Sequence, residues 1–400
     1  MVDDTAPQVL RRARSYAPDP ILLPFRAREV LACGAELKNT FCMTKDDYAF
    51  LSQHIGDLDN LETLTHYEHV LTHYRKFFRL SPTIVAHDKH PDYLSTRFAQ
   101  DLKIRDNSVT LVPVQHHHAH IVSCMVDNDL EPPVLGVAFD GTGYGEDGHI
   151  WGGEFLLVEY GKCKRLGHLE EVPLPGGEGA IKKPYRMAMS YLLTLLGEEA
   201  LRAKLPFLKR VSRVEQELIC IQLKKAINTP LTSSAGRLFD AVSALLDIRS
   251  EVDYEGQAAI ELEMMATEER EPEETYPFEI AEEDGLRMVR LREVFSHILA
   301  DLARGRPRVE IAVTFHHTIA KVIDHVCQAI ARDTGIRQVA LSGGVFQNRL
   351  LLKLSRRRLI NAGLTVLTHK GVPCNDGGIS LGQAVIAHFM MNQTQVQQKE

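Results

Sequence analysis

Several features are scarce or missing in this 400-residue sequence, and each absence narrows the classes of protein that it could form. It has one tryptophan and seven cysteines, none of them in a CxxC pair, so neither a disulfide framework nor a four-cysteine zinc site is predicted. Reduced thiols in a cytoplasmic protein fit this pattern best. No apolar run approaches the roughly 18 residues of a membrane-spanning helix, and the acidic residues 1–5 lack the apolar core of a signal peptide.

An excess of positive charge is also missing. Lys and Arg number 46 and Asp and Glu number 53, so the formal net charge is −7. An acidic chain is poorly suited to hold long stretches of phosphate backbone, and nucleic acid is therefore not expected as a partner. The 44% of apolar and 25% of charged residues are ordinary for a folded protein, and the length suits two lobes better than one.

Short apolar segments that alternate with helical spacing predict an α/β fold. A strand, a small-residue turn and a second strand occur over 30–42 and again over 134–158, which suggests a duplication. We expect a linker over 1–21, an N-terminal lobe over 22–130, and a C-terminal lobe over 131–400 that contains inserted helical segments and a closing helix.

Four histidines within five positions, at 116–120, form the strongest local motif. On a helix that begins here, His116 and His120 lie on one face, so both imidazoles can reach one metal ion. The glutamate of the zincin motif is missing, so protease chemistry is not expected. The alternative is a cluster that lines a pocket or faces solvent. His117 and His118 would point elsewhere, where they could hold substrate or act as bases.

A metal held by two histidines needs a further ligand, and Asp376 is the candidate. It lies in an Asn-Asp-Gly-Gly turn at 375–378 and would complete a two-histidine, one-carboxylate site with open coordination positions. The same turn could instead be a helix N-cap without a ligand role.

Glycine turns follow predicted strands in both halves of the chain, and each could bring backbone N–H groups against a phosphate. None is a P-loop or a GxGxxG motif, so each could also be an ordinary turn. Their recurrence predicts a nucleotide held between the two lobes. The candidate nucleotide-binding residues in these turns are Gly34, Lys38, Asn39, Thr40, Asp140, Gly141, Thr142, Gly143, Gly343 and Gly344.

Two other positions could touch the nucleotide. The loop with Gly176 and Gly177 could act as a lid, helped by lysine and arginine side chains that follow it, or could be a plain surface turn. Asn348, expected one turn into a helix, could meet a ribose or phosphate with its amide or could lie on the helix surface. The acid-rich residues 268–284 are expected to form a solvent-exposed loop that extends from the domain.

Nine ordered segments together resemble the C-terminal carbamoyltransferase region of the HypF family of hydrogenase maturation proteins, over residues 22–391. The segments are LACGAELKNT (31–40), SQHIGDL (52–58), HPDYLST (90–96), QHHHAH (115–120), FDGTGYG (139–145), TSSAGRLFD (232–240), YEGQAA (254–259), SGGVFQN (342–348) and NDGGISLGQ (375–383).

This resemblance implies an α/β, two-lobed, duplicated actin/hexokinase-like fold, of the kind shared with the proteins that transfer threonylcarbamoyl groups to tRNA. It implies iron or zinc held by His116, His120 and Asp376, and ATP or carbamoyl-adenylate, with Mg²⁺ as a further ion. It also implies that the carbamoyl group passes to the C-terminal cysteine of the dehydratase HypE, on the way to the cyanide ligands of nickel–iron hydrogenase.

The chain departs from the full-length family before residue 22. We find no counterpart there of the acylphosphatase, zinc-finger and carbamoyl-adenylate-forming (YrdC-like) domains, and residues 10–20 resemble the tail of the last of these. The source of carbamoyl-adenylate is therefore an open question. The alternative functions are a transferase for tRNA or small-molecule hydroxyl groups, and a non-catalytic scaffold that binds a nucleotide.

Overall fold

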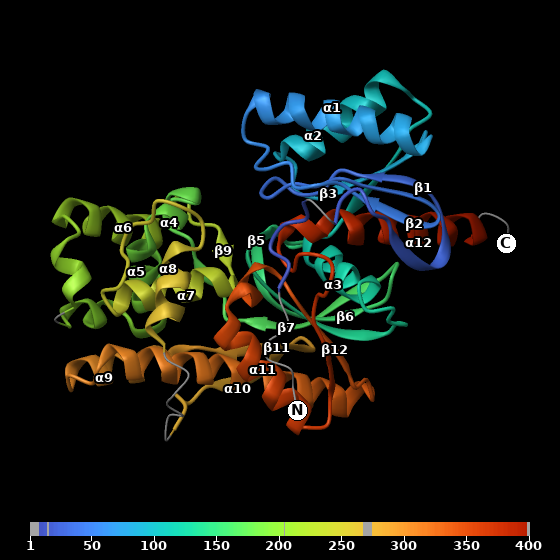
Figure 1. Cartoon of the computed structure of the whole chain (residues 1–400). Coiled ribbons are helices and arrows are strands. Elements are labelled where there is room, and N and C mark those ends of the chain that lie inside the picture. Colours follow the sequence, from blue (N-terminus) through green and yellow to red (C-terminus); the bar gives the residue numbers. More distant parts are fainter. Residues whose placement is uncertain (1–7, 14–15, 204, 267–273, 398–400) are drawn as a thin grey trace.

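Two sheets, each flanked by helices, divide the chain into two lobes that lie one above the other in Figure 1. The computed structural model describes residues 8–13, 16–203, 205–266 and 274–397. The strand order is β2-β1-β3-β4 in the first sheet and β10-β11-β7-β6-β5-β12-β13 in the second. The prediction of a two-lobed α/β fold is confirmed.

The first sheet forms the upper lobe. Its strands are β1 (Ile21–Ala32), β2 (Cys42–Leu51), β3 (Ile84–Asp88) and β4 (Thr110–Val114). Strand β1 is antiparallel to β2 and parallel to β3, which in turn is parallel to β4. Helices α1 (Leu61–Phe78) and α2 (Leu94–Arg105) cover its outer face, where Tyr67 and Phe98 meet edge to face at 5.1 Å.

The second sheet repeats this arrangement and extends it. Its main strands are β5 (Val134–Tyr144), β6 (Ile150–Val158), β7 (Cys163–Leu169), β10 (Glu279–Glu283), β11 (Leu286–Arg290), β12 (Gln338–Ser342) and β13 (Thr365–Leu367), with the short β8 (Val172–Pro173) and β9 (Leu231–Thr232) beside them. Strand β5 is antiparallel to β6 and parallel to β12, which is parallel to β13. The two lobes therefore share one strand plan, as the repeated sequence pattern suggested.

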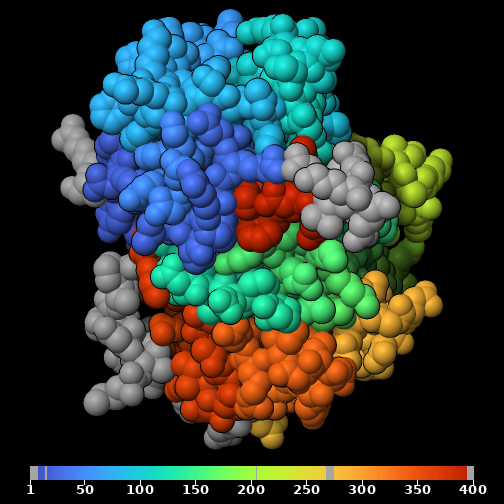
Figure 2. Space-filling view, turned by 90° about the vertical axis from the view of Figure 1, so that its right-hand side faces the viewer, coloured from blue at the N-terminus to red at the C-terminus, as the bar shows by residue number. Residues whose placement is uncertain are grey.

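Two helices lie between the sheets, and each packs on a different sheet. Helix α3 (His116–Val126) contacts β5, β6 and β12 of the second sheet. Helix α12 (Ile379–Gln397) contacts the four strands of the first sheet and also packs against α3. By its packing α3 therefore belongs with the lower lobe, although the expected boundary at residue 130 stays a prediction. In Figure 2 residues close to the C-terminus, in red, reach the surface between the two lobes.

A group of helices lies beside and below the second sheet in Figure 1. They are α4 (Glu178–Lys182), α5 (Pro184–Tyr191), the π-helix η1 (Leu192–Leu196), the 3-10 helices η2 (Glu198–Arg202) and η3 (Pro206–Lys209), α6 (Arg213–Lys225), α7 (Ala235–Leu245), α8 (Gln257–Met265), α9 (Arg292–Ala303) and α10 (Arg308–Thr334). After β12 come the 3-10 helix η4 (Gly344–Gln347), α11 (Arg349–Asn361) and the 3-10 turn η5 (Asp376–Gly378).

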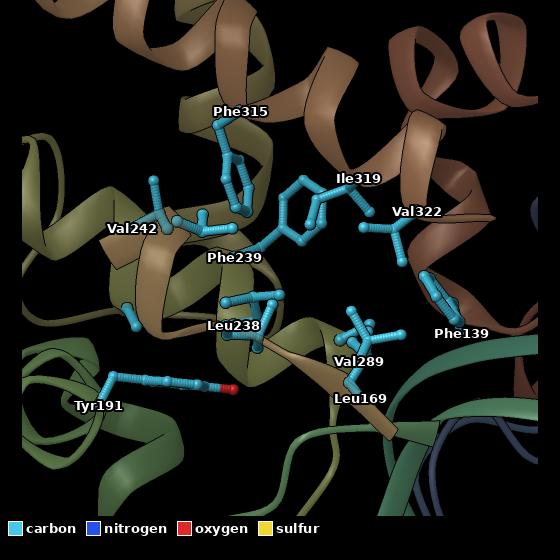
Figure 3. Packing of buried hydrophobic residues seen from close by; sticks show 14 of the residues in the cluster. Phe139, Leu169, Tyr191, Leu238, Phe239, Val242, Val289, Phe315, Ile319 and Val322 are labelled. Atoms are coloured by element: carbon cyan, nitrogen blue, oxygen red, sulfur yellow. The ribbon is translucent and has the colours of Figure 1, made fainter. Parts of the chain in front are cut away.

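Aromatic side chains tie these helices to the second sheet. Phe239 of α7 and Phe315 of α10 meet edge to face at 5.0 Å, and Phe139 of β5 stacks on Phe346 at 5.8 Å. Figure 3 shows Phe239 between Phe315 and Ile319. Burying each such ring stabilises the fold by roughly 1.5–3 kcal/mol. Because Phe139 directly precedes Asp140, this core fixes the part of β5 on which the site is built.

Two expectations need correction. Gly141, Thr142 and Gly143 were expected in a turn, but β5 continues to Tyr144 because a bulge between Phe139 and Gly143 absorbs the small residues within the ladder. The acid-rich residues 268–284 were expected to form a solvent-exposed loop. Residues 279–283 instead form β10, an edge strand that pairs with β11, because Ile280 packs on the core. Residues 267–273 lie outside the described part of the chain.

Within the expected linker over 1–21, Arg12 attaches the described residues to the body of the protein. The Arg12 side chain is buried and donates to the carbonyl oxygens of Gly371 and Asp19, over 3.2 and 3.0 Å, and to that of Tyr16. Its own carbonyl oxygen accepts the backbone N–H of His54. In the ranges that the structure describes, no helix combines the length and apolar character needed to cross a bilayer.

Candidate metal centre and inter-lobe cavity

Four buried side chains converge where α3, β5 and η5 meet. Ligand atoms of His116, His120, Asp140 and Asp376 all lie within 4.8 Å of one another. Asp140 Oδ2 lies 3.0 Å from His120 Nε2 and 3.3 Å from His116 Nε2. Asp376 Oδ1 lies 3.7 Å from His120 Nε2 and 3.9 Å from His116 Nε2. The structure therefore brings together the three side chains that the sequence suggested as ligands, and adds Asp140 to them.

The start of α3 sets the register of the histidines. Gln115 is the N-cap, and its side-chain oxygen accepts the backbone N–H of His118 over 2.9 Å. Positions 116 and 120 then face the same side, one turn apart. Gly143 leaves room for them, because a Cβ atom there would stand 2.4 Å from His117 Cε1 and 2.9 Å from His116 Cδ2.

The two carboxyl groups of this cluster differ in their affinity for protons. Burial and the neighbouring Asp140 carboxylate raise the pKa of Asp376 to about 6. Burial would raise the pKa of Asp140 too, but the imidazoles of His120 and His116 outweigh it and hold that pKa well below its usual value. Burial likewise lowers the pKa of His116, but the carboxylates of Asp88 and Asp140 outweigh this and raise it well above the usual value.

These donors fit a divalent metal ion. Two carboxylates buried side by side repel one another, and a cation between them relieves that repulsion. Imidazole nitrogens with carboxylate oxygens suit zinc or ferrous iron, whereas magnesium and calcium prefer sets of oxygen ligands.

The two other histidines of the motif occupy different surroundings. The ring of His117 lies against His116 and Trp151, and its Nε2 atom is buried without a hydrogen-bond partner among the described residues. Burial lowers the pKa of His117 well below its usual value. His118 Nε2 instead lies 2.8 Å from the carbonyl oxygen of Glu159, beyond the far end of β6.

A cavity of about 330 Å³ opens beside the four-residue cluster, and its size suits a small ligand. Its walls come from both lobes and from the inserted helices. They include Leu10, Lys38, Asp140, Gly141, Arg237, Phe239, Asp240, Glu255, Ala259, Ile260, Glu263, Gly344, Val345, Gln347, Asn348, Asn375 and Asp376. Lys38 of the upper lobe forms an ion pair with Glu255, which precedes α8, so charged side chains meet across the cavity.

The glycine turns reach this cavity to different extents. Gly343 has a φ of 106°, and a Cβ atom there would stand 2.1 Å from the Phe139 carbonyl oxygen, so only glycine fits. The next residue, Gly344, donates its N–H to Asp140 Oδ1 over 2.9 Å. Gly34, with a φ of 77°, donates its N–H to Gln383 of α12 instead.

Several of the predicted nucleotide-binding residues make hydrogen bonds within the fold or lie away from the cavity. Asn39 is buried and donates to the carbonyl oxygens of Cys33 and Ala35 within its own turn. Thr40 Oγ1 donates to the Gly377 carbonyl oxygen over 2.9 Å and so joins the upper lobe to η5. Thr142 and Gly143 lie on β5 and are not among the cavity walls.

The lid expected at Gly176 and Gly177 is also not part of the cavity wall. Gly176 donates to the Asn228 carbonyl oxygen, and Arg186, which was expected to face phosphates, pairs with Glu215 of α6. Asn348 does line the cavity, but it is the N-cap of α11 and not a residue one turn inside it, because its Oδ1 accepts the backbone N–H of Leu351 over 2.8 Å.

Sequence reasoning missed some residues of the site. Arg237 and Asp240 pair with each other on α7 at the cavity wall, and Asp88 Oδ2 lies 2.7 Å from His116 Nδ1. The segments that contain Arg237 and Asp240 were visible as motifs, but a lone aspartate at the end of a buried strand gave no signal for Asp88.

Comparison with known proteins defines first a class and then a family. Residues 26–127 match the HypF Kae1-like domain, and residues 136–383 match the family described as carbamoyltransferase, Kae1-like domain, second subdomain. The fold is therefore that of a Kae1-like protein. Together these matches cover most of the chain, and the chain belongs to the HypF carbamoyltransferase family.

Individual relatives agree with this assignment. Carbamoyltransferase HypF2 of Cupriavidus necator is 39% identical over 95% of this chain and 49% of its own length. The crystal structure of a full-length HypF in a phosphate- and nucleotide-bound form superposes with a TM-score of 0.90 at 44% identity, covering 96% of this chain and 59% of that one. The chain thus spans about half the length of such relatives, whereas a carbamoyltransferase HypF homolog of Cupriavidus necator is matched over 91% of its length at 36% identity.

Proposed function

We propose that this chain transfers the carbamoyl group of carbamoyl-adenylate to the C-terminal cysteine thiol of a HypE-like dehydratase, a step toward the cyanide ligands of nickel–iron hydrogenase. One observation supports this above all: in a HypF-type chain, a buried cluster suited to a metal adjoins a cavity suited to a nucleotide. The two share the side chain of Asp140, which lines the cavity and belongs to the cluster.

We assign His116, His120, Asp140 and Asp376 as ligands of one zinc or iron ion. Such an ion supplies a Lewis acid that withdraws charge from a phosphate or carbamoyl oxygen. We assign the phosphates of ATP or carbamoyl-adenylate to the Gly344 turn, and the base to the apolar part of the wall, which includes Phe239, Ile260 and Val345.

In the transfer step, the acceptor sulfur attacks the carbamoyl carbon and forms a C–S bond. The bond from that carbon to the phosphate oxygen breaks, and AMP leaves with the electron pair. We assign the thiol proton to the ring of His117, because its low pKa keeps the ring neutral, with one nitrogen free of hydrogen. We do not assign it to His118, whose Nε2 is already bonded to Glu159. Holding the donor and the acceptor together in the right geometry can lower the activation barrier by roughly 7–11 kcal/mol.

The proposal is tested by mass spectrometry of the acceptor. The chain is incubated with carbamoyl-adenylate and a peptide ending like a HypE-type C-terminus, and the peptide should gain one carbamoyl group. A peptide with serine in place of the cysteine, and the His120→Ala variant with the intact peptide, should both give no product. Carbamoylation of tRNA in a parallel reaction, with no product on the peptide, would instead support the alternative acceptor and refute this proposal.

A further inference from the structure

We infer that Asp88 is a positioning residue of the metal centre, which holds His116 in the orientation and tautomer that a ligand needs. This inference rests on the proposed metal site. It assigns a role to the end of β3, a strand that contributes no ligand itself.

The geometry of the Asp88 carboxylate supports this role. Oδ2 lies 2.7 Å from His116 Nδ1, and Oδ1 accepts the backbone N–H of His90 over 2.9 Å. An ionised carboxylate only accepts hydrogen bonds, so the hydrogen of the imidazole must lie on Nδ1. The lone pair is then on Nε2, the atom that lies 3.3 Å from Asp140 Oδ2 and 3.9 Å from Asp376 Oδ1.

The position of Asp88 is itself well fixed. The residue is fully buried, pairs with Val114 in the ladder between β3 and β4, and accepts the hydroxyl of Thr96 on its carbonyl oxygen over 3.1 Å. Val114 stands two residues before His116, so the same pair of strands places both the carboxylate and the start of α3. The backbone ladder between β3 and β4 therefore fixes the distance between Asp88 and His116.

A carboxylate behind a metal-bound histidine has a known physical effect. It fixes the ring, sets the tautomer and makes the ligating nitrogen more basic, and its removal typically weakens metal affinity by about 10- to 100-fold. Asp88→Asn has nearly the same shape, but its amide N–H₂ can donate to Nδ1. The imidazole hydrogen then moves to Nε2, where it blocks the lone pair that should face the metal.

The experiment measures metal affinity independently of activity. Metal-free wild type and Asp88→Asn compete with a chromogenic chelator for Zn²⁺, and the variant should bind about 10- to 100-fold more weakly. Asp92→Asn is the matched control, since this aspartate lies on the following loop, with a side chain that is 73% exposed and paired with Arg97. Its affinity for Zn²⁺ should equal that of the wild type.

A spectrum keeps the inference testable even if Asp88→Asn fails to fold. Long-range ¹H–¹⁵N correlations of the Zn²⁺-loaded wild type, in which metal replaces a proton on the ring, should show His116 with its hydrogen on Nδ1, and a hydrogen on Nε2 would overturn the inference. A wild type that does not bind Zn²⁺ would refute the proposed metal site. If the wild type binds and Asp88→Asn binds equally well, the metal site stands and the role of Asp88 is wrong.

Discussion

The backbone N–H of Gly344 donates to Asp140 Oδ1 over 2.9 Å, while the other oxygen of the same carboxylate lies 3.0 Å from His120 Nε2. One side chain therefore joins the glycine turn of the cavity to the cluster of candidate ligands. A change at Asp140 should affect both of the functions that we propose for this region.

We expect Asp140→Asn to weaken both metal and nucleotide binding. The amide removes one negative charge from the ligand set, and its nitrogen cannot accept the Gly344 N–H if it faces that way. The loss in Zn²⁺ affinity should exceed the roughly 10- to 100-fold loss that is typical when a hydrogen-bond partner of a metal ligand is removed. Chelator competition and calorimetry with ATP measure the two effects. Asp101→Asn, at an exposed position of α2, should change neither, and an unchanged Zn²⁺ affinity for Asp140→Asn would contradict the ligand assignment.

The pH dependence of stability should show the contribution of His316. Burial lowers the pKa of this residue to about 4, and Nε2 lies 3.0 Å from Asn348 Nδ2. An unfolded histidine titrates near pH 6.5. Below that pH the unfolded state binds a proton that the folded state does not, so stability is complete above about pH 6.5 and falls toward pH 4, by up to about 1.4 kcal/mol per pH unit.

His316→Gln removes this titration but keeps an acceptor for Asn348. Between pH 7 and pH 5, the free energy of unfolding of the wild type should fall by about 2 kcal/mol more than that of the variant, as measured by urea denaturation. Because all other titrating groups are common to both proteins, their contributions cancel. Equal losses in the two proteins would show that His316 is not held neutral.

Gly382→Ala should destabilise the contact between α12 and α3. A Cβ atom at position 382 would stand 2.0 Å from the carbonyl oxygen of Ala119, so one of the helices must move. We expect a loss of about 1–3 kcal/mol in the free energy of unfolding, together with weaker Zn²⁺ binding, because Ala119 lies between the two histidine ligands. At Gly179 of α4 a Cβ atom would meet nothing within 4 Å, so Gly179→Ala should change stability by no more than about 0.5 kcal/mol.

Arg12→Lys should loosen the N-terminal segment. Lysine offers one ammonium group where the guanidinium reaches three carbonyl oxygens, including that of Gly371. Leaving buried carbonyl groups without a donor costs about 1–3 kcal/mol, and cleavage of residues 8–19 by a protease should become faster. Arg11→Lys, at an exposed neighbouring position, supplies the control. Equal cleavage rates for the two variants would contradict the role of Arg12.

Local sequence patterns predicted the parts of this molecule that depend on local geometry. The spacing of His116 and His120 fixes their common face on any helix, so their pairing could be predicted. Short apolar segments and glycine turns indicated most strands, and the recurrence of one pattern indicated the duplication that the two sheets show.

The remainder depended on tertiary contacts that have no local signature. Asp140 was interpreted as part of a glycine turn, because the sequence could not show that a bulge turns its carboxylate toward α3. Asp88 is one aspartate at the end of a buried strand, and only the fold places it behind His116. Arg12 lies in a segment without periodicity, so its three carbonyl partners could not be foreseen.

The crossing of α3 and α12 at Gly382 has a mechanical consequence. Each helix packs on a different sheet, so this close contact sets how the two sheets lie relative to one another. The histidine ligands lie on one of these helices, and Asp376 lies just before the other. Lys38 and Glu255, which come from different lobes, form an ion pair at the cavity wall. A shift of α12 against α3 would change the distances between Asp376 and the histidines, so the packing at Gly382 keeps the candidate ligands together.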